Sequence, residues 1–392
     1  MRRSEVLQEV RKMRFEDVYG RYRAKTLSCE EAADLLGASV STFYRMRSRY
    51  EEEGLEGLAD RRLGKLSARR APLNEVMKVL TLFETKYYDF TVKHFHEKLE
   101  GHGVHRSYTW TKKVLQQAGL AKKAPRRGAH RRKRPRRPLP GMMLHQDGSS
   151  HEWVTGRIWD LIVTMDDATN YIYSGFFVEE EGTMSSFTGL GEVIKEQGLF
   201  CSLYADRGSH YWTTKEAGGK VDRDNPTQVG RALRQLGIEL IPAYSPEARG
   251  RSERMFGTLQ KRLPQELRLR GIKHMEEANR FLKEEYLPAH NKRFAVSPEN
   301  EGTAFIPWVG QGLEDIISVQ EERTVGNDNT VRYKGLCLQI PADRHRYHYV
   351  KVKVRVHEYP DTTLAIFHGP RKLAHYSPDG QLLDKRIKEQ AA

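Results

Sequence analysis

Apolar positions in the N-terminal third of the chain recur at helical spacing. Ser28 stands before the first clear stripe and Glu31 follows three residues later, which is the arrangement of a capping box. Ser39 or Ser41 begins a second helix after a short turn that contains glycine. Helix, short turn and helix is the helix-turn-helix pattern, so the sequence predicts one such DNA-binding module in residues 1–65.

The same pattern returns in residues 66–121. Amphipathic segments occupy residues 73–88, 90–103 and 107–120, and Ser107 is placed to cap the third of them. These segments predict a second module of the helix-turn-helix or winged-helix-like type. In either module, an ordinary helical hairpin with a solvated basic face would give the same pattern.

After residue 139 the pattern changes to short apolar runs that alternate with helical stretches. Three strand-like runs come first, and strands and helices then follow in turn up to residue 304. This order predicts an α/β domain whose sheet is covered by helices on both sides. The predicted strands lie at residues 142–147, 157–165, 171–178, 199–205 and 238–244, and the predicted helices at residues 184–197, 226–236, 248–263 and 276–287.

Residues 305–392 are β-type in character. Valine alternates with lysine or arginine over residues 350–356, as expected of a strand with one buried face. Five such runs, separated by turns, predict a small all-β barrel at the C-terminus. Such a domain either contacts DNA, bridges subunits or serves as a structural cap, and the sequence leaves these roles open. The chain as a whole is therefore expected to be multidomain.

Composition favours a polyanionic partner. The chain has 392 residues, 30% of them charged, and a formal net charge of +14. An excess of positive charge on this scale is typical of nucleic-acid-binding proteins, and it favours DNA over the alternative of solvated basic faces. No apolar run is long enough for a membrane span, and the N-terminus lacks the apolar core of a signal peptide. The three cysteines are isolated and odd in number, so we expect reduced thiols and a cytoplasmic, nucleoid-associated protein.

The most basic segment is a predicted linker at residues 122–138. Ten of the residues from 122 to 137 are lysine or arginine, none is acidic, and prolines interrupt the segment. Such a segment is either a solvated tether or a tether that neutralises DNA phosphates and adds affinity without sequence preference. Both interpretations make it a linker between DNA-binding modules and the α/β domain.

Three carboxylates stand at comparable positions in the α/β domain. Asp147 and Asp206 each follow a strand-like run, and Glu253 lies on the helix after the last strand. A lone acid at a strand end usually caps the next turn, but three convergent carboxylates would make a site for a hard cation. Glu247 is an alternative to Glu253. We favour Glu253 because it lies at the edge of the apolar stripe of its helix.

The motifs around these acids resemble those of the transposase and retroviral-integrase superfamily. They read D-G after the first strand, A-D-R-G-S-H-Y after a later one, and Y-S-P-x-x-x-G-x-x-E-R on the following helix. The resemblance covers residues 139–299, and the whole layout is most similar to bacterial insertion-sequence transposases of the ISNCY type. It implies an RNase H-like integrase catalytic core and matches Asp147, Asp206 and Glu253 to the acidic triad. The gap from Asp206 to Glu253 holds 46 residues, longer than usual in the family, and the surplus falls in the polar stretch at residues 214–228.

The resemblance also implies a reaction. A transposase of this kind binds the terminal inverted repeats of an insertion sequence, cleaves phosphodiesters at the element ends to free 3′-OH groups, and joins these to target DNA. Two Mg²⁺ ions per site, for which Mn²⁺ can substitute, would serve a two-metal mechanism at the triad. The expected partners are double-stranded DNA and further copies of the chain, as a homodimer or higher oligomer. The alternatives are a transposase-derived DNA-binding regulator that does not join DNA, against which all three acids argue, and a metal-dependent DNA endonuclease.

The candidate DNA-contacting residues are polar or basic side chains on the second helix of the first module, at the third helix of the second module, in the linker and beside Glu253. They are Thr42, Tyr44, Arg45, Arg47 and Arg49; Arg106, Tyr108, Thr109, Lys112 and Lys113; Arg126, Arg127, Arg131, Arg132 and Arg134; and Arg249, Arg251 and Arg254.

Two other groups of polar residues have structural interpretations. The four histidines between residues 94 and 105 have no cysteine nearby, and His94 and His96 would point to different faces of a helix. We therefore expect no zinc. Asp166 and Asp167 follow a predicted strand and are explained by the turn that they form.

Overall fold

A computed structural model describes residues 3–60, 70–122, 134–214, 216, 219–244, 246–343 and 345–383, with side chains from residue 7 onward and without those of residues 246–249. The chain divides into two compact units, Met1–Met77 and Lys78–Ala392. Each unit is described by itself. The five domain boundaries expected from the sequence stay predictions.

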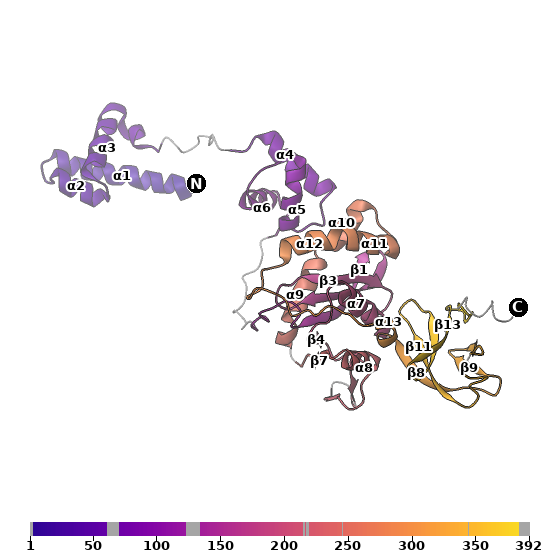
Figure 1. Ribbon diagram of the computed structural model, residues 1–392. Coiled ribbons are helices and arrows are strands. Elements are labelled where there is room, and N and C mark those ends of the chain that lie inside the picture. Colours follow the sequence, from indigo (N-terminus) through magenta and orange to yellow (C-terminus); the bar gives the residue numbers. More distant parts are fainter. Residues whose placement is uncertain are drawn as a thin grey trace. The chain divides into compact units, whose positions relative to one another are not determined.

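The first unit is helical (Figure 1). It contains α1 (Arg3–Arg23), α2 (Cys29–Leu36), α3 (Val40–Glu53) and the 3-10 turn η1 (Gly54–Leu58). Ser28 and Glu31 form the predicted capping box, and the Ser39 side chain caps α3 by accepting from the backbone N–H of Thr42. Aromatic side chains fill the core between the helices, with Phe15 and Phe43 fully buried. The two-helix pattern predicted for this segment is confirmed, with α1 added in front of it.

The helical segments predicted between residues 73 and 120 are also present. They are α4 (Leu73–Thr85), α5 (Val92–Leu99), the short turn η2 (Glu100–His102) and α6 (Tyr108–Gln117). Ser107 caps α6 as predicted, by accepting from the backbone N–H of Trp110. Phe83, Phe95 and Leu115 pack in a core shared by the three helices.

A five-stranded sheet forms the centre of the second unit. Its strands are β1 (Leu144–Val154), β2 (Arg157–Asp166), β3 (Ile172–Val178), β4 (Ser202–Ala205) and β7 (Glu239–Pro242), in the order β3-β2-β1-β4-β7. The first three strands pair antiparallel, whereas β1 with β4 and β4 with β7 pair parallel. All five strands were predicted from the apolar runs.

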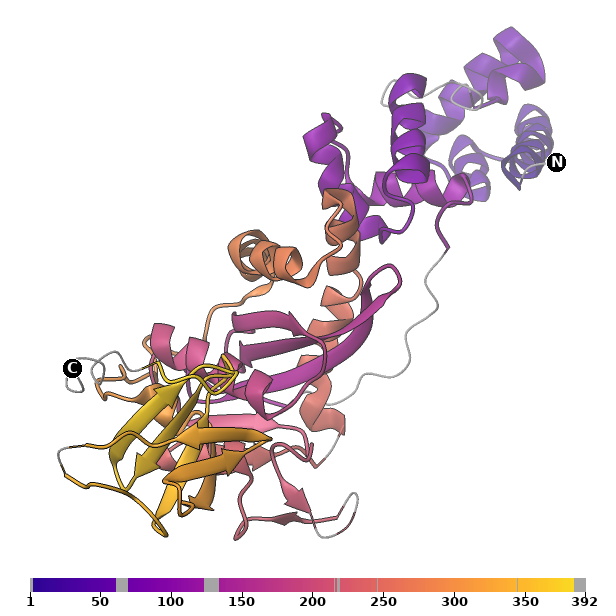
Figure 2. The ribbon, with the colours of Figure 1, turned by 90° about the vertical axis from the view of Figure 1, so that its right-hand side faces the viewer.

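Helices cover both faces of this sheet, as predicted (Figure 2). Against one face pack α7 (Thr183–Glu196), α8 (Gln228–Gln235) and α13 (Leu313–Ile316), around Leu144 and Leu203 of the sheet. Against the other pack α9 (Pro246–Leu259), α10 (Leu263–Arg270), α11 (Met275–Phe281), the π-helical segment η3 (Leu282–Tyr286) and α12 (Leu287–Phe294). The core is therefore a three-layer α/β/α sandwich. None of the helices in the described ranges is long and apolar enough to cross a membrane.

The polar stretch at residues 214–228 was predicted to be a surface insertion. Part of it forms a small hairpin of β5 (Thr213–Thr214) and β6 (Val221–Asp222), after which α8 begins at Gln228. Residues 215, 217 and 218 lie outside the described residues.

The C-terminal region is all-β, but its strands form two sheets. One is four-stranded and antiparallel, in the order β13-β12-β11-β8, and the other pairs β10 with β9. The strands are β8 (Val319–Thr324), β9 (Thr330–Tyr333), β10 (Leu336–Gln339), β11 (Lys353–Glu358), β12 (Leu364–His368) and β13 (Arg371–Tyr376). The run at residues 329–341 is two strands rather than one, because Lys334 and Gly335 turn with positive φ. One apolar core lies between the two sheets, and the predicted closed barrel is not confirmed.

Candidate active site

Asp147 and Asp206 lie side by side on neighbouring strands. The parallel register pairs Leu144 with Leu203 and His145 with Tyr204, and two residues further along this register Asp147 stands opposite Asp206. Asp206 directly follows the last residue of β4, as predicted. Asp147 does not end its strand. That expectation is wrong, because β1 continues to pair with β2 as far as Val154 after β4 has stopped.

Both carboxylates belong to the face of the sheet that α9 covers. Side chains alternate between the faces of a strand. Leu144, Leu203 and Ala205 pack under α7 and α8, so Asp147 and Asp206 point to the opposite face. Their charges also act on one buried hydroxyl: burial raises the pKa of Tyr211 well above its ordinary value, and the charges of Glu181, Asp147 and Asp206 raise it further.

Helix α9 follows β1 along this face. Within the first half of α9, Arg251 donates to Asp167, which in turn bonds His145 of β1. Directly after the C-terminal end of α9, the Gln260 amide donates to the Ser149 hydroxyl of β1 at 3.0 Å. Nine helical residues rise by about 13 Å and four strand residues by about 13 Å, so the two anchors are consistent with a helix that runs beside the strand.

Glu253 lies between these two anchors, on the flank of α9. Met255, Phe256 and Leu259 are buried against the sheet, which confirms the predicted packing stripe, whereas Glu253 is exposed. Among the described residues, no three acidic, histidine or cysteine side chains gather closely enough to hold a metal ion. The side chain of Glu247 lies outside the described residues. The assignment of Glu253 as the third acid therefore stays a prediction.

The turn after Asp206 also fixes its carboxylate. Asp206 Oδ1 accepts the backbone N–H of Gly208 at 2.8 Å, so the turn-capping interpretation of this acid and the active-site interpretation hold together.

A fourth acid, Glu181, lies against the backbone next to Asp147 and was missed in the sequence. A Cβ at Gly148 would lie 2.2 Å from Glu181 Oε2, so the glycine after Asp147 leaves room for this carboxylate. Glu181 Oε1 lies 3.4 Å from His210 Nε2. The D-G pair was the signal: a glycine inside a strand indicates that another group approaches the backbone closely.

Asp167 lies in the turn after β2, as predicted, but its side chain does not cap that turn. Its neighbour Asp166 serves the turn, by accepting from the backbone N–H and hydroxyl of Thr169 at 2.8 Å each. Asp167 is fully buried instead and accepts from Arg134, Arg251, the His145 ring at 2.8 Å and the backbone N–H of Arg137 at 2.8 Å. Burial raises the pKa of Asp167, but these donors and the charge of Arg251 outweigh it and hold the pKa well below its ordinary value. The sequence did contain a signal for this role: two acids follow each other at the end of a strand, although one acid is enough to cap the turn.

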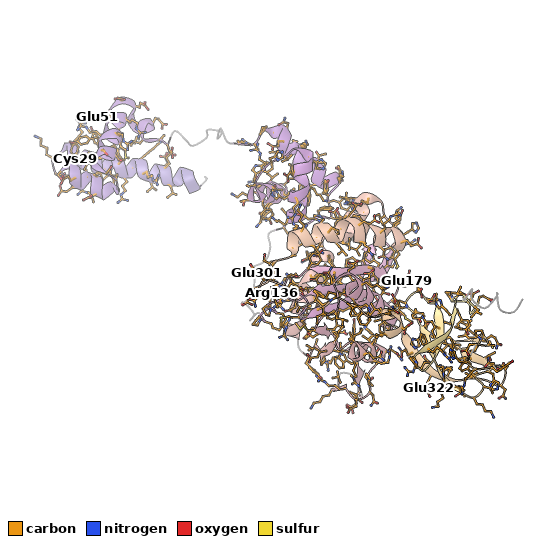
Figure 3. All side chains as sticks on the ribbon, in the orientation of Figure 1. Cys29, Glu51, Arg136, Glu179, Glu301 and Glu322 are labelled. Carbon is orange, nitrogen blue, oxygen red and sulfur yellow. The ribbon has the colours of Figure 1, made fainter. Side chains whose placement is uncertain are left out.

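Other arginines before β1 hold the same turn. Arg136, labelled in Figure 3, donates to the carbonyl oxygens of Asp167 and Ala168 and to the Asn170 side chain, at 2.8 to 3.1 Å. The end of the basic segment is thus tied to the sheet by several hydrogen bonds rather than by one contact.

The candidate recognition helix of the first unit presents part of the predicted set. Tyr44, Arg45 and Arg49 are exposed on α3. Thr42 is half-buried and bonds Ser39 and Arg45. Arg47 bonds Glu51 at 2.8 Å and lies over the Tyr22 ring, so its guanidinium is already engaged within the unit.

The candidate recognition helix α6 carries the second set. Tyr108, Thr109 and Lys113 are exposed, and Lys112 is half-exposed. Arg106 precedes the helix in sequence, and its guanidinium lies over the Trp110 ring. These positions are consistent with the predicted DNA-contacting role, which stays a prediction.

The basic positions near the core divide differently. Arg126, Arg127, Arg131, Arg132 and the side chain of Arg249 lie outside the described residues. Arg254 is exposed on α9. Arg251 was expected on DNA, but its side chain is only 12% exposed and bonds Asp167 and the carbonyl oxygen of Arg134. Arg134 likewise bonds Asp167, so for both arginines the structure gives a partner within the core.

Three of the four clustered histidines make structural contacts, and His102 Nε2 lies 2.9 Å from the Tyr87 hydroxyl. His96 Nδ1 lies 3.1 Å from the Thr111 hydroxyl. His94 is buried, and its Nε2 lies 2.7 Å from Glu266 on α10. Burial lowers the pKa of His94, although its hydrogen bond with Glu266 acts in the opposite direction. This contact belongs to a polar interface between α5 and α10 that the sequence did not indicate.

Comparison with known proteins supports this description. A family model described as a helix-turn-helix domain matches residues 21–66. The Sinorhizobium fredii protein y4bF, whose name assigns it as a transposase, is 30% identical over 342 residues, which cover 86% of this chain and 74% of y4bF. The transposase for insertion sequence IS1202 of Streptococcus pneumoniae is 29% identical over 211 residues, 54% of this chain and 45% of that protein.

Solved structures give a weaker likeness. The simian T-cell lymphotropic virus intasome in complex with the PP2A regulatory subunit B56γ aligns with a TM-score of 0.34 and 15% identity, over 72% of this chain and 95% of that chain. The dimeric form of the HTLV-2 integrase catalytic core domain with magnesium aligns with a TM-score of 0.28 and 15% identity, over 36% of this chain and 83% of that chain. Likenesses at this level carry no argument about this chain. The match to y4bF does, because it extends over most of both proteins, and the chain therefore belongs to the insertion-sequence transposase family.

Proposed function

We propose that this transposase cleaves phosphodiesters at the ends of its insertion sequence and joins the freed 3′-OH groups to target DNA, with Asp147, Asp206 and Glu253 as the acids of its active site. The observation that carries the proposal is the parallel register of β1 and β4, because its continuation by two residues brings Asp147 opposite Asp206 where β4 ends. A crevice outside the carboxyl end of a parallel strand is the usual place for a site in an α/β sheet.

The donor set of Asp147 and Asp206 fits a divalent cation such as Mg²⁺. Neighbouring strands lie about 4.8 Å apart, which lets two carboxylates reach one ion, and hard cations prefer oxygen ligands. Glu253 is exposed on the flank of α9 and would have to turn toward the sheet to join them. Bound ions would activate the attacking oxygen and stabilise the leaving oxygen.

The residues of the chain itself have three tasks in this proposal. Asp147 and Asp206 supply two negatively charged carboxylates at fixed positions, and the Gly208 N–H orients the carboxylate of Asp206. Arg254 stands next to Glu253 and is exposed, where it can hold a DNA phosphate. The helical modules bind the terminal repeats, which the helix-turn-helix match at residues 21–66 supports.

The test uses the purified full-length chain, DNA from the ends of the element that carries its gene, and Mg²⁺. Joined products support the proposal, nicks without joining favour an endonuclease, and binding alone favours a regulator. We expect Asp147→Asn, Asp206→Asn and Glu253→Gln to abolish cleavage and joining while the Kd for end DNA stays within about twofold.

Glu247→Gln is the matched control, since it removes the same charge from the same helix. An active Glu253→Gln chain together with an inactive Glu247→Gln chain would show that the third acid is wrongly assigned.

A further inference from the structure

The residue two positions before each proposed active-site acid belongs to one buried cluster. His145 precedes Asp147, Tyr204 precedes Asp206, and Arg251 precedes Glu253. We call Asp167, Arg134 and these three residues the Asp167 cluster. We propose that the Asp167 cluster positions the three acids relative to one another, with Asp167 as its positioning residue; this rests on the proposed function.

The contacts of the cluster join three separate elements. Asp167 bonds His145 of β1 at 2.8 Å and forms an ion pair with Arg251 of α9. The His145 ring packs edge-on against the Tyr204 ring of β4 with centroids 5.1 Å apart. Arg134 pairs with Asp167 and lies over the Tyr204 ring at 5.7 Å. One carboxylate thus fixes β1, β4 and α9 to each other directly or through one ring.

Strand geometry transmits this constraint to the two aspartates. Side chains two residues apart stand on the same face of a strand, about 7 Å apart. A fixed His145 therefore fixes the strand at Asp147, and a fixed Tyr204 does the same at Asp206. The two pairs stand in matching register on adjacent strands.

Loss of the ion pair between Asp167 and Arg251 should affect the position of α9 more than the positions of β1 and β4. The acids of the sheet are held by backbone hydrogen bonds in addition, whereas the segment of α9 near Glu253 meets the sheet through Arg251, Ser252 and the apolar stripe. Arg251 also donates to the carbonyl oxygen of Arg134 at 2.7 Å. Removing the charge of Asp167 leaves the Arg251 guanidinium, whose side chain is only 12% exposed, without its counter-ion, which is strongly unfavourable for a buried charge. Arg251 then turns to solvent, and α9 loses its anchor.

The cluster also connects the basic segment to the site. Arg134 is the first described residue after residues 123–133, and it contacts both Asp167 and Tyr204. Asp167 therefore also holds the residue at which the described part of the basic segment begins.

The first test is hydrogen exchange of the full-length chain without DNA or metal. In Asp167→Asn we expect amides 250–259 of α9 to exchange at least tenfold faster than in the wild type, with amides of α7 unchanged. Asp166→Asn is the matched control, because it alters the equally buried neighbouring acid, whose carboxylate accepts hydrogen bonds from Gly141 and Thr169. Unchanged exchange in α9 of Asp167→Asn would overturn the proposal.

The second test is the Mg²⁺ dependence of cleavage. Misplacing a reacting group by about 1 Å can cost on the order of 100-fold in rate. We expect Asp167→Asn to cleave about 100-fold more slowly and to need about tenfold more Mg²⁺ for half-maximal rate, with the Kd for end DNA unchanged. A general loss of stability would lower the active fraction without moving the Mg²⁺ midpoint, and an unmoved midpoint would therefore refute the positioning role.

A further variant covers the case in which Asp167→Asn does not fold. Arg251→Lys keeps the charge but loses the bond to the Arg134 carbonyl oxygen, and we expect smaller shifts of the same sign in both tests. Wild-type exchange and cleavage in Arg251→Lys would also refute the proposal. If the wild-type chain shows no cleavage under any condition, the proposed function fails, and the exchange of α9 still decides whether the cluster anchors that helix.

Discussion

Glu266 gives the sharpest test of how α5 is held against the core. Its side chain is 8% exposed and bonds His94 at 2.7 Å, Lys98 at 2.6 Å and Arg270 at 2.9 Å. Burial raises the pKa of this carboxyl, but the hydrogen bonds from His94 and Lys98 outweigh it and hold the pKa at about 2. The carboxylate charge therefore stabilises the interface between α5 and α10.

The magnitude follows from that pKa. A reduction from the ordinary value of 4.5 to about 2 corresponds to about 3 kcal/mol. Lys98 and Arg270 are about a third exposed, so water compensates part of the loss, and we expect Glu266→Gln to weaken the interface by about 2 kcal/mol. Because the folded pKa is depressed, this stabilisation is fully present above pH 4.5 and is lost as the pH falls through about 2. At pH 7 the whole difference should be measurable.

Hydrogen exchange of the α5 amides at pH 7 measures this opening. A change of 2 kcal/mol predicts exchange about 30-fold faster in Glu266→Gln. Glu285→Gln is the control, because Glu285 also bonds Arg270, at 3.1 Å, but is 62% exposed. We expect less than a twofold effect there. Exchange in Glu266→Gln within about threefold of the wild type would refute the reasoning from burial and charge.

Three further predictions concern DNA, assembly and acid stability. An Asp147→Asn chain should bind the terminal repeat in preference to unrelated DNA, with an affinity that falls steeply as salt rises; equal affinity for both DNAs would contradict the specificity. A chain lacking residues 1–60, mixed with full-length Asp206→Asn, should restore joining if one protomer binds an end and another cleaves it, and a mixture that stays inactive would contradict catalysis in trans. Burial and the charge of Arg262 lower the pKa of His290 to about 4. Its neutral form therefore stabilises the fold above pH 6.5 and less as the pH falls toward 4, so the wild type should lose about 2 kcal/mol more than His290→Gln between pH 7.5 and pH 5, measured by denaturant unfolding.

Local patterns in the sequence determined the elements of this protein and two of its candidate acids. The capping box at Ser28, the cap at Ser107 and the packing stripe of α9 depend on residues close in the chain, and the structure contains each of them. The alternation of apolar runs and helical stretches predicted a sheet between helical layers for the same reason. Asp206 was found at a strand end because strand ends are marked by adjacent turn residues.

Only the tertiary structure decided which distant groups meet. The length of β1 beyond Asp147 depends on β2, which continues to supply hydrogen-bond partners after β4 has ended. The division of the run at residues 329–341 into β9 and β10 depends on the positive φ angles of Lys334 and Gly335, and the pairing of strands into two sheets is decided by contacts between distant segments. The sequence explained Asp167 only by its turn, because its partners Arg134, His145 and Arg251 are brought to it by the linker, β1 and α9. Charge pairs between elements far apart in the chain leave no periodic trace in the sequence, since each partner is specified by the fold alone.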